Sequence, residues 1–393
     1  MEKKVKKSSY VRKPSSFWWI VATFLVKVFY KTRIKIKTKK EQRIKPLDGS
    51  LILFNHSSMY DYIALFDALH KKKFHYVCTT YFFRNKKLAR LLNALGVIPK
   101  EQYKADLKSV LKMRNVINNG GIITLAPEGQ ITLDGKTQTI IRGTEKLIKT
   151  LNVNVYVSII KGSYLSNTKW AIKKSRGPIS VETKLILTKN EVQTMTNEEI
   201  YDRIVKELEY NDYDNARDNH LLYKNYHKAL GFENIAFYCP KCHEFDSIYT
   251  ENNKVICNKC GFEVFFFPHE SDFMSNKIVK NPQEWYEIEY ELMTNLAKDD
   301  NFTLEHHGNL EIIESVEIVG TDYINIKMNN KTITLSSDKM NEVIDVDKVL
   351  NFTNKMNKYL EIPTVDRQYK IYFDNPREIF KFVLLMKVIK GYK

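Results

Sequence analysis

The sequence predicts an α/β protein with a mixed, mostly parallel sheet covered by helices, followed by a cysteine ribbon and a small, mainly antiparallel domain. Three observations carry this prediction. Short apolar runs alternate with helical patterns, two Cys-x2-Cys pairs follow them, and strand-like runs with a final helix fill the last third. We therefore expect five parts: an arm over 1–47, the α/β domain over 48–190, a helical connector over 191–235, the ribbon over 236–264 and the β-rich domain over 265–393.

The positive charge of the chain is concentrated in the arm. The 393 residues include 62 Lys and Arg against 46 Asp and Glu, a formal net charge of +16. Residues 1–47 hold 15 of the basic groups and 2 of the acidic ones, which is +13, so the remainder carries only +3. Such a charge indicates an anionic partner, either nucleic acid or a membrane surface.

An apolar, aromatic segment, Phe17–Tyr30, lies inside the arm. As a helix it would be about 21 Å long, short of the roughly 30 Å hydrocarbon core of a bilayer. Trp at one end and Lys or Arg at both flanks are typical of a helix that lies in the membrane interface. A buried core helix is the alternative, and a signal peptide is disfavoured because no small-residue cleavage site follows. We expect residues 1–47 to bind an anionic membrane surface, at the cytoplasmic face of the cell membrane, as a peripheral or monotopic anchor.

The elements of the α/β domain follow in order along the chain. Apolar runs with strand character predict strands at Leu51–Phe54, His75–Thr79, Ile122–Ala126, Val153–Ile160 and Val181–Leu187. Helical patterns stand between them, most clearly over Asp106–Asn118, where two glycines mark the end. Strands that alternate with helices indicate a sheet with helices on its faces.

The connector and the last third are also patterned. Thr196 and Glu199 form a capping box that opens an amphipathic helix. Farther on, we expect antiparallel strands at Ile312–Val319, Tyr323–Met328, Lys331–Leu335 and Gln368–Phe373. A final helix is expected at Pro376–Ile389. This order is similar in shape to a pleckstrin-homology-like or GRAM-like barrel, which would serve as a membrane- or partner-binding module or as a stabilising extension.

Four of the five cysteines have metal-ligand spacing: Cys239, Cys242, Cys257 and Cys260. Each Cys-x2-Cys turn directs two thiolates to one side, and two such turns supply the tetrahedral sulfur site that structural Zn²⁺ takes. Two disulfides or a redox iron site are the alternatives, and the Lys-rich, apparently intracellular character of the chain disfavours disulfides. We expect structural Zn²⁺ and no redox cofactor. Cys78, alone on a predicted strand, is interpreted as an apolar filler.

Polar side chains follow two of the predicted strands. Asn55 and His56 come directly after Leu51–Phe54, and Asp61 lies five residues beyond His56. A carboxylate that binds one ring nitrogen leaves the other nitrogen free to act as a base. Glu128 follows a second strand, and the carboxyl ends of parallel strands share one edge of a sheet, so His56 and Glu128 can share a site.

With these blocks the sequence resembles the 1-acylglycerol-3-phosphate acyltransferase (PlsC-like) family of glycerolipid acyltransferases. The resemblance covers roughly residues 45–190 and rests on four blocks in the family's order: Asn55-His56-x4-Asp61, Gly96-Val97-Ile98-Pro99-Lys100, Ala126-Pro127-Glu128-Gly129 and Val153–Ile160. It implies that His56 and Asp61 are catalytic, with His56 taking the proton of the acceptor hydroxyl and Asp61 orienting it.

The resemblance also implies the residues that bind the acceptor: Asn55, Lys100, Glu128 and Gly129. The family often has Thr-Arg after its Glu-Gly, whereas Gln130-Ile131 follow here, so one expected phosphate-binding cation is missing. Arg142 or Arg84 could replace it. Lys100 stands where an Arg is usual, and this exchanges a bidentate fork for a point charge.

The function that this resemblance implies is a membrane-associated acyltransferase of phospholipid biosynthesis. It would move a fatty acyl group from acyl-CoA or acyl carrier protein to the free hydroxyl of a lysophospholipid, first of all 1-acylglycerol-3-phosphate. Another lipid alcohol as acceptor is the alternative. A non-enzymatic, nucleic-acid-binding zinc ribbon is disfavoured because residues 238–261 carry three Lys against three acidic residues, so no nucleic acid partner is expected.

Overall fold

The computed structural model forms two compact units: residues 1–168 with 175–223, and residues 169–174 with 224–393. The described residues are 10–33, 35–36, 47–101, 106–267, 272, 277–314, 317–349, 352–356, 358–364 and 367–392. The first unit ends at Tyr223, inside the predicted connector. The finer five-part division stays a prediction.

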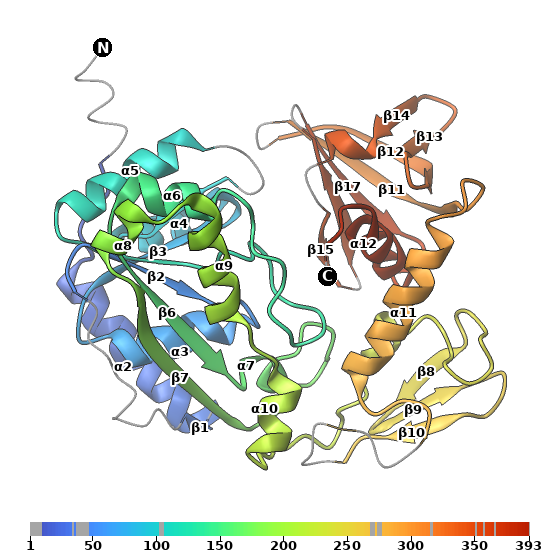
Figure 1. Ribbon diagram of the computed structural model, residues 1–393. Coiled ribbons are helices and arrows are strands. Elements are labelled where there is room, and N and C mark those ends of the chain that lie inside the picture. The colour runs from blue at the N-terminus through green and yellow to red at the C-terminus, as the bar shows by residue number, and fades with distance from the viewer. Residues whose placement is uncertain are drawn as a thin grey trace. The chain divides into compact units, whose positions relative to one another are not determined.

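The first unit is built on a seven-stranded sheet in the order β1-β7-β6-β2-β5-β3-β4 (Figure 1). The strands are β1 (Lys35–Ile36), β2 (Ser50–Phe54), β3 (Phe74–Thr79), β4 (Ile98–Lys100), β5 (Ile122–Leu125), β6 (Asn154–Lys161) and β7 (Pro178–Leu187). The five neighbours from β6 to β4 run parallel, and β7 is antiparallel to β6. The predicted mixed, mostly parallel sheet is confirmed.

Helices cover both faces of this sheet because the side chains of its central strand alternate. Leu51 and Leu53 of β2 face a core with α5, α6 and α9, while Ile52 and Phe54 face a core with α2 and α3. The helices of this unit are α2 (Ser16–Arg33), α3 (Tyr60–Leu69), α4 (Lys86–Ala94), α5 (Leu107–Asn118), α6 (Thr144–Leu151), α7 (Ser163–Ser166), α8 (Lys189–Thr194), α9 (Asn197–Leu208) and α10 (Asp212–Asp218), with the 3-10 turn Thr80–Arg84.

Helix α2 is apolar on two sides. Trp19 is buried against Phe66 and Phe74, and its indole N–H donates to the carbonyl of His70 at 2.9 Å. The opposite side exposes large apolar side chains: Phe17 66%, Ile20 68%, Phe24 65% and Leu25 57%. Among the described helices, none combines the length and the apolar character that crossing a bilayer requires.

The second unit holds two antiparallel sheets and two long helices (Figure 1). The three-stranded sheet consists of β8 (Ile248–Glu251), β9 (Lys254–Cys257) and β10 (Glu263–Phe265), and α11 (Pro282–Leu296) follows it. The seven-stranded sheet has the order β14-β13-β12-β11-β17-β16-β15. Its strands are β11 (Leu304–Glu314), β12 (Glu317–Met328), β13 (Thr332–Ser336), β14 (Asn341–Asp345), β15 (Thr353–Lys355), β16 (Tyr359–Pro363) and β17 (Gln368–Phe373).

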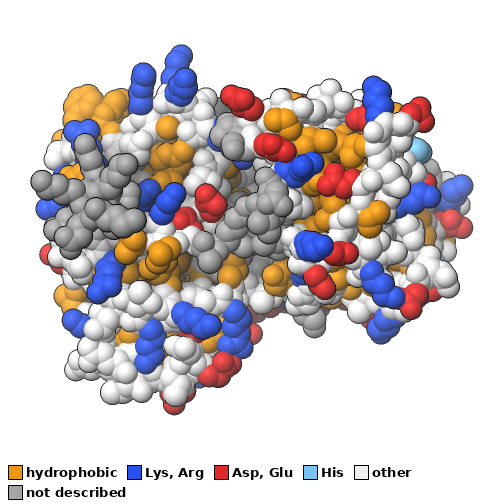
Figure 2. All heavy atoms as spheres, turned by 90° about the horizontal axis from the view of Figure 1, so that it is seen from above, with side chains coloured by type: hydrophobic (Ala, Val, Ile, Leu, Met, Phe, Trp, Pro, Cys, Tyr) orange, Lys and Arg blue, Asp and Glu red, His pale blue; other side chains and the backbone are white. Residues whose placement is uncertain are grey.

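This sheet confirms the predicted antiparallel domain and corrects one strand. The single strand expected over Ile312–Val319 is wrong, because β11 ends at Glu314 and β12 begins at Glu317 as its antiparallel neighbour. The final helix, α12 (Glu378–Ile389), is almost wholly buried, and its Phe382 packs on Phe373 of β17. Over the surface seen in Figure 2, Lys and Arg side chains are mixed with Asp and Glu side chains.

Candidate active site and candidate metal centre

The end of strand β2 is fixed to its neighbour by the side chain of Asn55. The amide oxygen accepts a hydrogen bond from the N–H of Ile160 at 2.7 Å, and the amide nitrogen donates to the carbonyl of the same residue at 3.0 Å. Asn55 is 1% exposed and so continues the β2–β6 pairing by one step with its side chain. Its predicted part in acceptor binding stays a prediction.

His56 and Asp61 meet directly after this point. Nδ1 of His56 lies 3.0 Å from Oδ2 of Asp61, which is fully buried at the start of α3. The same oxygen accepts the backbone N–H groups of Ser57 at 2.7 Å and Ser58 at 2.8 Å. The loop between the two residues is therefore folded around the carboxylate, which explains why a separation of five positions suits this pair.

This arrangement sets the tautomer of His56. A carboxylate that already accepts two N–H groups acts as an acceptor only, so Nδ1 carries the proton and donates to it. Nε2 then presents its lone pair and is the nitrogen that can take a proton from another group. The negative charge of Asp61 stabilises the imidazolium that forms in that step.

Glu128 holds the His56 loop from the side of β5. Its Oε1 accepts the backbone N–H of His56 at 2.6 Å, and its Oε2 accepts the backbone N–H of Gln138 at 2.7 Å. Burial raises the pKa of Glu128 to about 8, against the two N–H donors, which favour the ionised form. Both oxygens are thus engaged by the backbone, and the predicted part of Glu128 in acceptor binding stays a prediction.

Gly129 occupies a position that only glycine suits. Its φ is +72°, and a Cβ there would lie 2.5 Å from Cδ1 of Ile141. The N–H of Ile141 donates to the carbonyl of Pro127 at 3.0 Å, so the Pro-Glu-Gly turn lies against the segment before α6. The turn thereby brings Glu128 under His56.

Neither predicted cation contacts the His56–Asp61 pair: Lys100 ends a separate strand, and Arg142 is paired with another residue. Lys100 ends β4, which is three strands from β2, or about 14 Å at ordinary strand spacing. Burial lowers the pKa of its ammonium group. Arg142 forms a bidentate pair with Glu198 at 2.8 and 3.0 Å and stacks on the ring of Tyr201. Their predicted parts in acceptor binding stay predictions.

Further residues at this site escaped the sequence analysis. The hydroxyl of Tyr62 lies 3.5 Å from Nε2 of His56. Behind the loop, the hydroxyl of Ser58 bonds that of Ser163 at 2.7 Å, and the N–H of Thr132 donates to the carbonyl of His56 at 3.0 Å. The sequence offered one indication of Tyr62, its position directly after Asp61. In the first turn of a helix, consecutive side chains point to different sides, so Asp61 and Tyr62 can contact different parts of His56.

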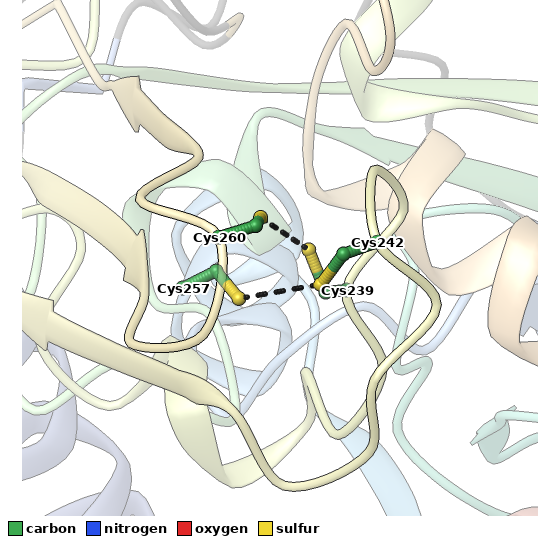
Figure 3. A group of neighbouring side chains, drawn as sticks. All are labelled: Cys239, Cys242, Cys257 and Cys260. Atoms are coloured by element: carbon green, nitrogen blue, oxygen red, sulfur yellow. Dashed lines mark hydrogen bonds between the residues drawn. The ribbon is translucent and has the colours of Figure 1, made fainter.

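The four predicted cysteine ligands come together in the second unit (Figure 3). The four sulfur atoms all lie within 4.8 Å of one another. The sulfurs of Cys239 and Cys260 are 3.9 Å apart, and those of Cys242 and Cys257 are 3.7 Å apart. Four sulfurs at about 2.3 Å from a tetrahedral Zn²⁺ are about 3.8 Å apart, so the cluster fits this ion. The four thiols are free, which excludes the disulfide alternative. They could hold a metal ion.

The two Cys-x2-Cys turns share a backbone conformation. The residue after the second cysteine of each pair has a left-handed backbone: φ is +67° at His243 and +68° at Gly261. Behind the first turn, Glu289 of α11 accepts the N–H groups of Phe237 at 2.7 Å and Tyr238 at 3.0 Å, and burial raises its pKa. The cluster is thereby anchored to the helix of its own unit.

Comparisons with known proteins find the following similarities. A crystal structure of the 1-acyl-sn-glycerophosphate acyltransferase PlsC from Thermotoga maritima is similar at 16% identity and a TM-score of 0.37, over 48% of this chain and 79% of that one. The N-terminal PH domain of human ARAP2 is similar at 12% identity and a TM-score of 0.19, over 22% of this chain and 80% of that one. Inner membrane complex sub-compartment protein 3 from Toxoplasma gondii is similar at 14% identity and a TM-score of 0.19, over 26% of this chain and 85% of that one.

Among curated proteins, a sequence search finds no significant match. The family model described as Acyltransferase matches residues 35–161, the part of the chain that holds β2, β5 and the loop of His56 and Asp61. The His56–Asp61 pair at the carboxyl edge of the sheet holds a ring nitrogen that can act as a general base. The chain therefore contains an acyltransferase domain and is an acyltransferase.

Proposed function

We propose that the protein moves a fatty acyl group from acyl-CoA or acyl carrier protein to the free hydroxyl of a lysophospholipid at a membrane surface, in phospholipid biosynthesis. The acceptor that the sequence blocks favour is 1-acylglycerol-3-phosphate. The observation that carries the proposal is the His56–Asp61 pair, in which Nε2 lies on the side of the ring away from the carboxylate, 3.5 Å from the hydroxyl of Tyr62, and can take a proton. A single general base suffices for acyl transfer from a thioester donor to a hydroxyl acceptor.

The chemical step needs no nucleophile from the protein. Nε2 of His56 takes the proton of the acceptor hydroxyl as its oxygen attacks the thioester carbonyl, and Asp61 stabilises the imidazolium. Collapse of the tetrahedral intermediate breaks the carbon–sulfur bond, and the imidazolium returns the proton to the leaving thiolate. The products are an acylated lipid and a free thiol.

The neighbouring serines support direct transfer. The hydroxyl of Ser57 accepts a hydrogen bond from the Asn55 amide at 3.1 Å, and that of Ser58 bonds Ser163 at 2.7 Å. Neither hydroxyl is a partner of Nε2, so neither Ser57 nor Ser58 forms the nucleophile–base contact that an acyl-enzyme would need. The acceptor itself then supplies the attacking oxygen.

The exposed side of α2 supports docking to a membrane. Phe17, Ile20 and Phe24 recur three and four positions apart, so they share one face of the helix, and each is about two-thirds exposed. Burial of such a face in the acyl boundary, with the +13 of residues 1–47 against anionic headgroups, would hold the enzyme at its lipid substrate. We propose that this arm binds the cytoplasmic face of the cell membrane.

The four-cysteine cluster is proposed to hold Zn²⁺ as a structural ion. Its ligands are four thiolates, which fill a tetrahedral shell and leave no open position for a substrate. Cys239, Cys242, Cys257 and Cys260 would bind the ion in the second unit, whereas His56 belongs to the first. Such an ion would therefore supply stability to the second unit.

Lipid mass spectrometry tests the proposal most broadly. Purified protein is given acyl-CoA or acyl carrier protein together with vesicles that contain lysophosphatidic acid, other lysophospholipids and monoacylglycerol. We expect one lysophospholipid to gain an acyl chain in step with the release of free thiol. Acylation of monoacylglycerol alone would favour the alternative of another lipid alcohol, and no acylated lipid in any mixture would contradict the proposed function.

A further inference from the structure

Tyr62 faces the nitrogen of His56 that the proposed mechanism uses. Its hydroxyl lies 3.5 Å from Nε2, while Asp61, the preceding residue, binds Nδ1 at 3.0 Å. Two consecutive side chains of the first turn of α3, Asp61 and Tyr62, thus each contact one of the two ring nitrogens of His56. Within the described part of the chain, Nε2 is the one hydrogen-bond partner of the Tyr62 hydroxyl.

The ring of Tyr62 is held in place from three sides. It makes edge-to-face contacts with Phe54 at 5.9 Å, with His56 at 5.4 Å and with Tyr76 at 5.4 Å between ring centroids. The hydroxyl of Tyr76 donates to the backbone carbonyl of Tyr62 at 2.5 Å. The phenol oxygen is therefore fixed before any substrate binds, and its use costs little reorganisation.

The hydroxyl remains a donor throughout the pH range of an enzyme assay. Burial raises the pKa of Tyr62, and the charge of Asp61 raises it further. Tyr62 therefore does not act as a second base beside His56. A neutral O–H group close to the reacting atoms can donate a hydrogen bond to an oxygen that gains negative charge.

We propose that Tyr62 is a further catalytic residue, whose O–H group donates to the thioester carbonyl oxygen as that oxygen becomes an oxyanion. The inference rests on the proposed acyl transfer. A hydroxyl that gives its proton to Nε2 lies about 2.6–3.2 Å from this nitrogen. The acceptor hydroxyl attacks a thioester carbonyl that lies next to it. The oxygen of this carbonyl therefore comes within reach of the Tyr62 hydroxyl, which is 3.5 Å from the same nitrogen of His56.

The step is balanced without any further group. The acceptor oxygen forms a bond to the carbonyl carbon as its proton passes to Nε2 of His56. The π electron pair of the carbonyl moves to its oxygen, which accepts the hydrogen bond from Tyr62. When the pair returns, the carbon–sulfur bond breaks and His56 protonates the thiolate, while Tyr62 keeps its own proton.

The test is Tyr62→Phe in the full-length protein, because this change removes the hydroxyl and keeps the ring contacts. Loss of one oxyanion donor reduces turnover by about 100-fold or more. We expect this loss in kcat, with little change in the KM of the thioester and the lysophospholipid. Tyr156→Phe is the matched control, since its hydroxyl accepts the N–H of Leu47 at 3.3 Å and does not contact His56.

The pH profile of kcat separates an oxyanion donor from a residue that tunes the base. If Tyr62 donates to the oxyanion, Tyr62→Phe lowers the whole profile and leaves its acid limb in place. A shifted acid limb would mean that Tyr62 acts through His56, and a kcat within threefold of the wild type would mean that it does not act at all. Either result overturns the inference while acyl transfer itself remains, whereas an inactive wild type would instead remove the proposed function.

Discussion

Replacement of Asp61 by asparagine tests how the buried carboxylate supports His56. The variant keeps the size of the side chain and an oxygen that can accept the N–H groups of Ser57 and Ser58, but it removes the negative charge. The carboxylate oxygen lies 3.0 Å from Nδ1. It is this charge that faces the imidazolium formed in the transition state.

The magnitude follows from the geometry. With 3.0 Å between the two atoms, the charges of the carboxylate and the imidazolium are centred about 4 Å apart, which at an effective dielectric constant of 20 corresponds to about 4 kcal/mol. A loss of that size in the transition state lowers kcat by roughly 10³-fold. The KM values should change little, because the charge acts on a group that is neutral in the ground state.

Initial rates of thiol release, with vesicles that carry the lysophospholipid, measure the effect. Asp67→Asn is the matched control, since Asp67 lies on the same helix, α3, and its side chain has no contact with His56 among the described residues. Thermal unfolding of both variants shows whether the fold is kept. A folded Asp61→Asn variant that retains more than a tenth of wild-type kcat would refute this account of the pair.

Three further predictions concern Glu128, helix α2 and the cysteine cluster. Above about pH 8, where Glu128 is ionised and both of its oxygens accept backbone N–H groups, Glu128→Gln places an NH₂ group against one of these donors, so kcat should fall about tenfold in the thiol-release assay. The pKa of Glu128 is raised from 4.5 to about 8, so between these pH values the folded protein binds more protons at this group than the unfolded chain does. The contribution of this group to the free energy of unfolding therefore falls as the pH rises through that window. The slope of the melting temperature against pH should therefore be flatter in Glu128→Gln, and an unchanged slope would speak against the raised pKa. Phe24→Ser should reduce sedimentation with anionic vesicles and leave the melting temperature nearly unchanged, whereas Trp19→Ala should cost about 3–5 kcal/mol of stability; equal vesicle binding by Phe24→Ser and wild type would contradict membrane docking by α2. Cys239→Ser should lower the zinc content measured by elemental analysis and the melting temperature, without a change in acyl-chain preference; a native protein that contains no zinc would contradict the metal assignment.

The elements of the fold were predictable where the pattern is local. Alternation along Leu51–Phe54 serves two cores, one on each face of the sheet, and such a run reads as a buried strand. The exception is Ile312–Val319. Glu-Ser-Val-Glu at its centre contains no Gly, Pro, Asn or Asp to mark a turn, so a hairpin between β11 and β12 looked like one strand.

The site was predictable in its reacting pair and not in its supports. His56 and Asp61 are five residues apart, and a short loop after a strand brings such residues together. The partner of Arg142 is Glu198, 56 positions farther along the chain, which no spacing rule reveals. The bonds of Glu128 to the N–H groups of His56 and Gln138 likewise depend on the tertiary fold, because any side chain at those two positions offers the same backbone donor.

The central claim is that Nε2 of His56 accepts the proton of a lipid hydroxyl during acyl transfer. The most direct test compares wild type and His56→Ala for acylated lipid and free thiol formed from acyl-CoA and a lysophospholipid on vesicles. We expect equal amounts of both products from the wild type, and at least a 10³-fold lower rate from a variant with an unchanged melting temperature. Undiminished acyl transfer by the folded His56→Ala variant would contradict the mechanism.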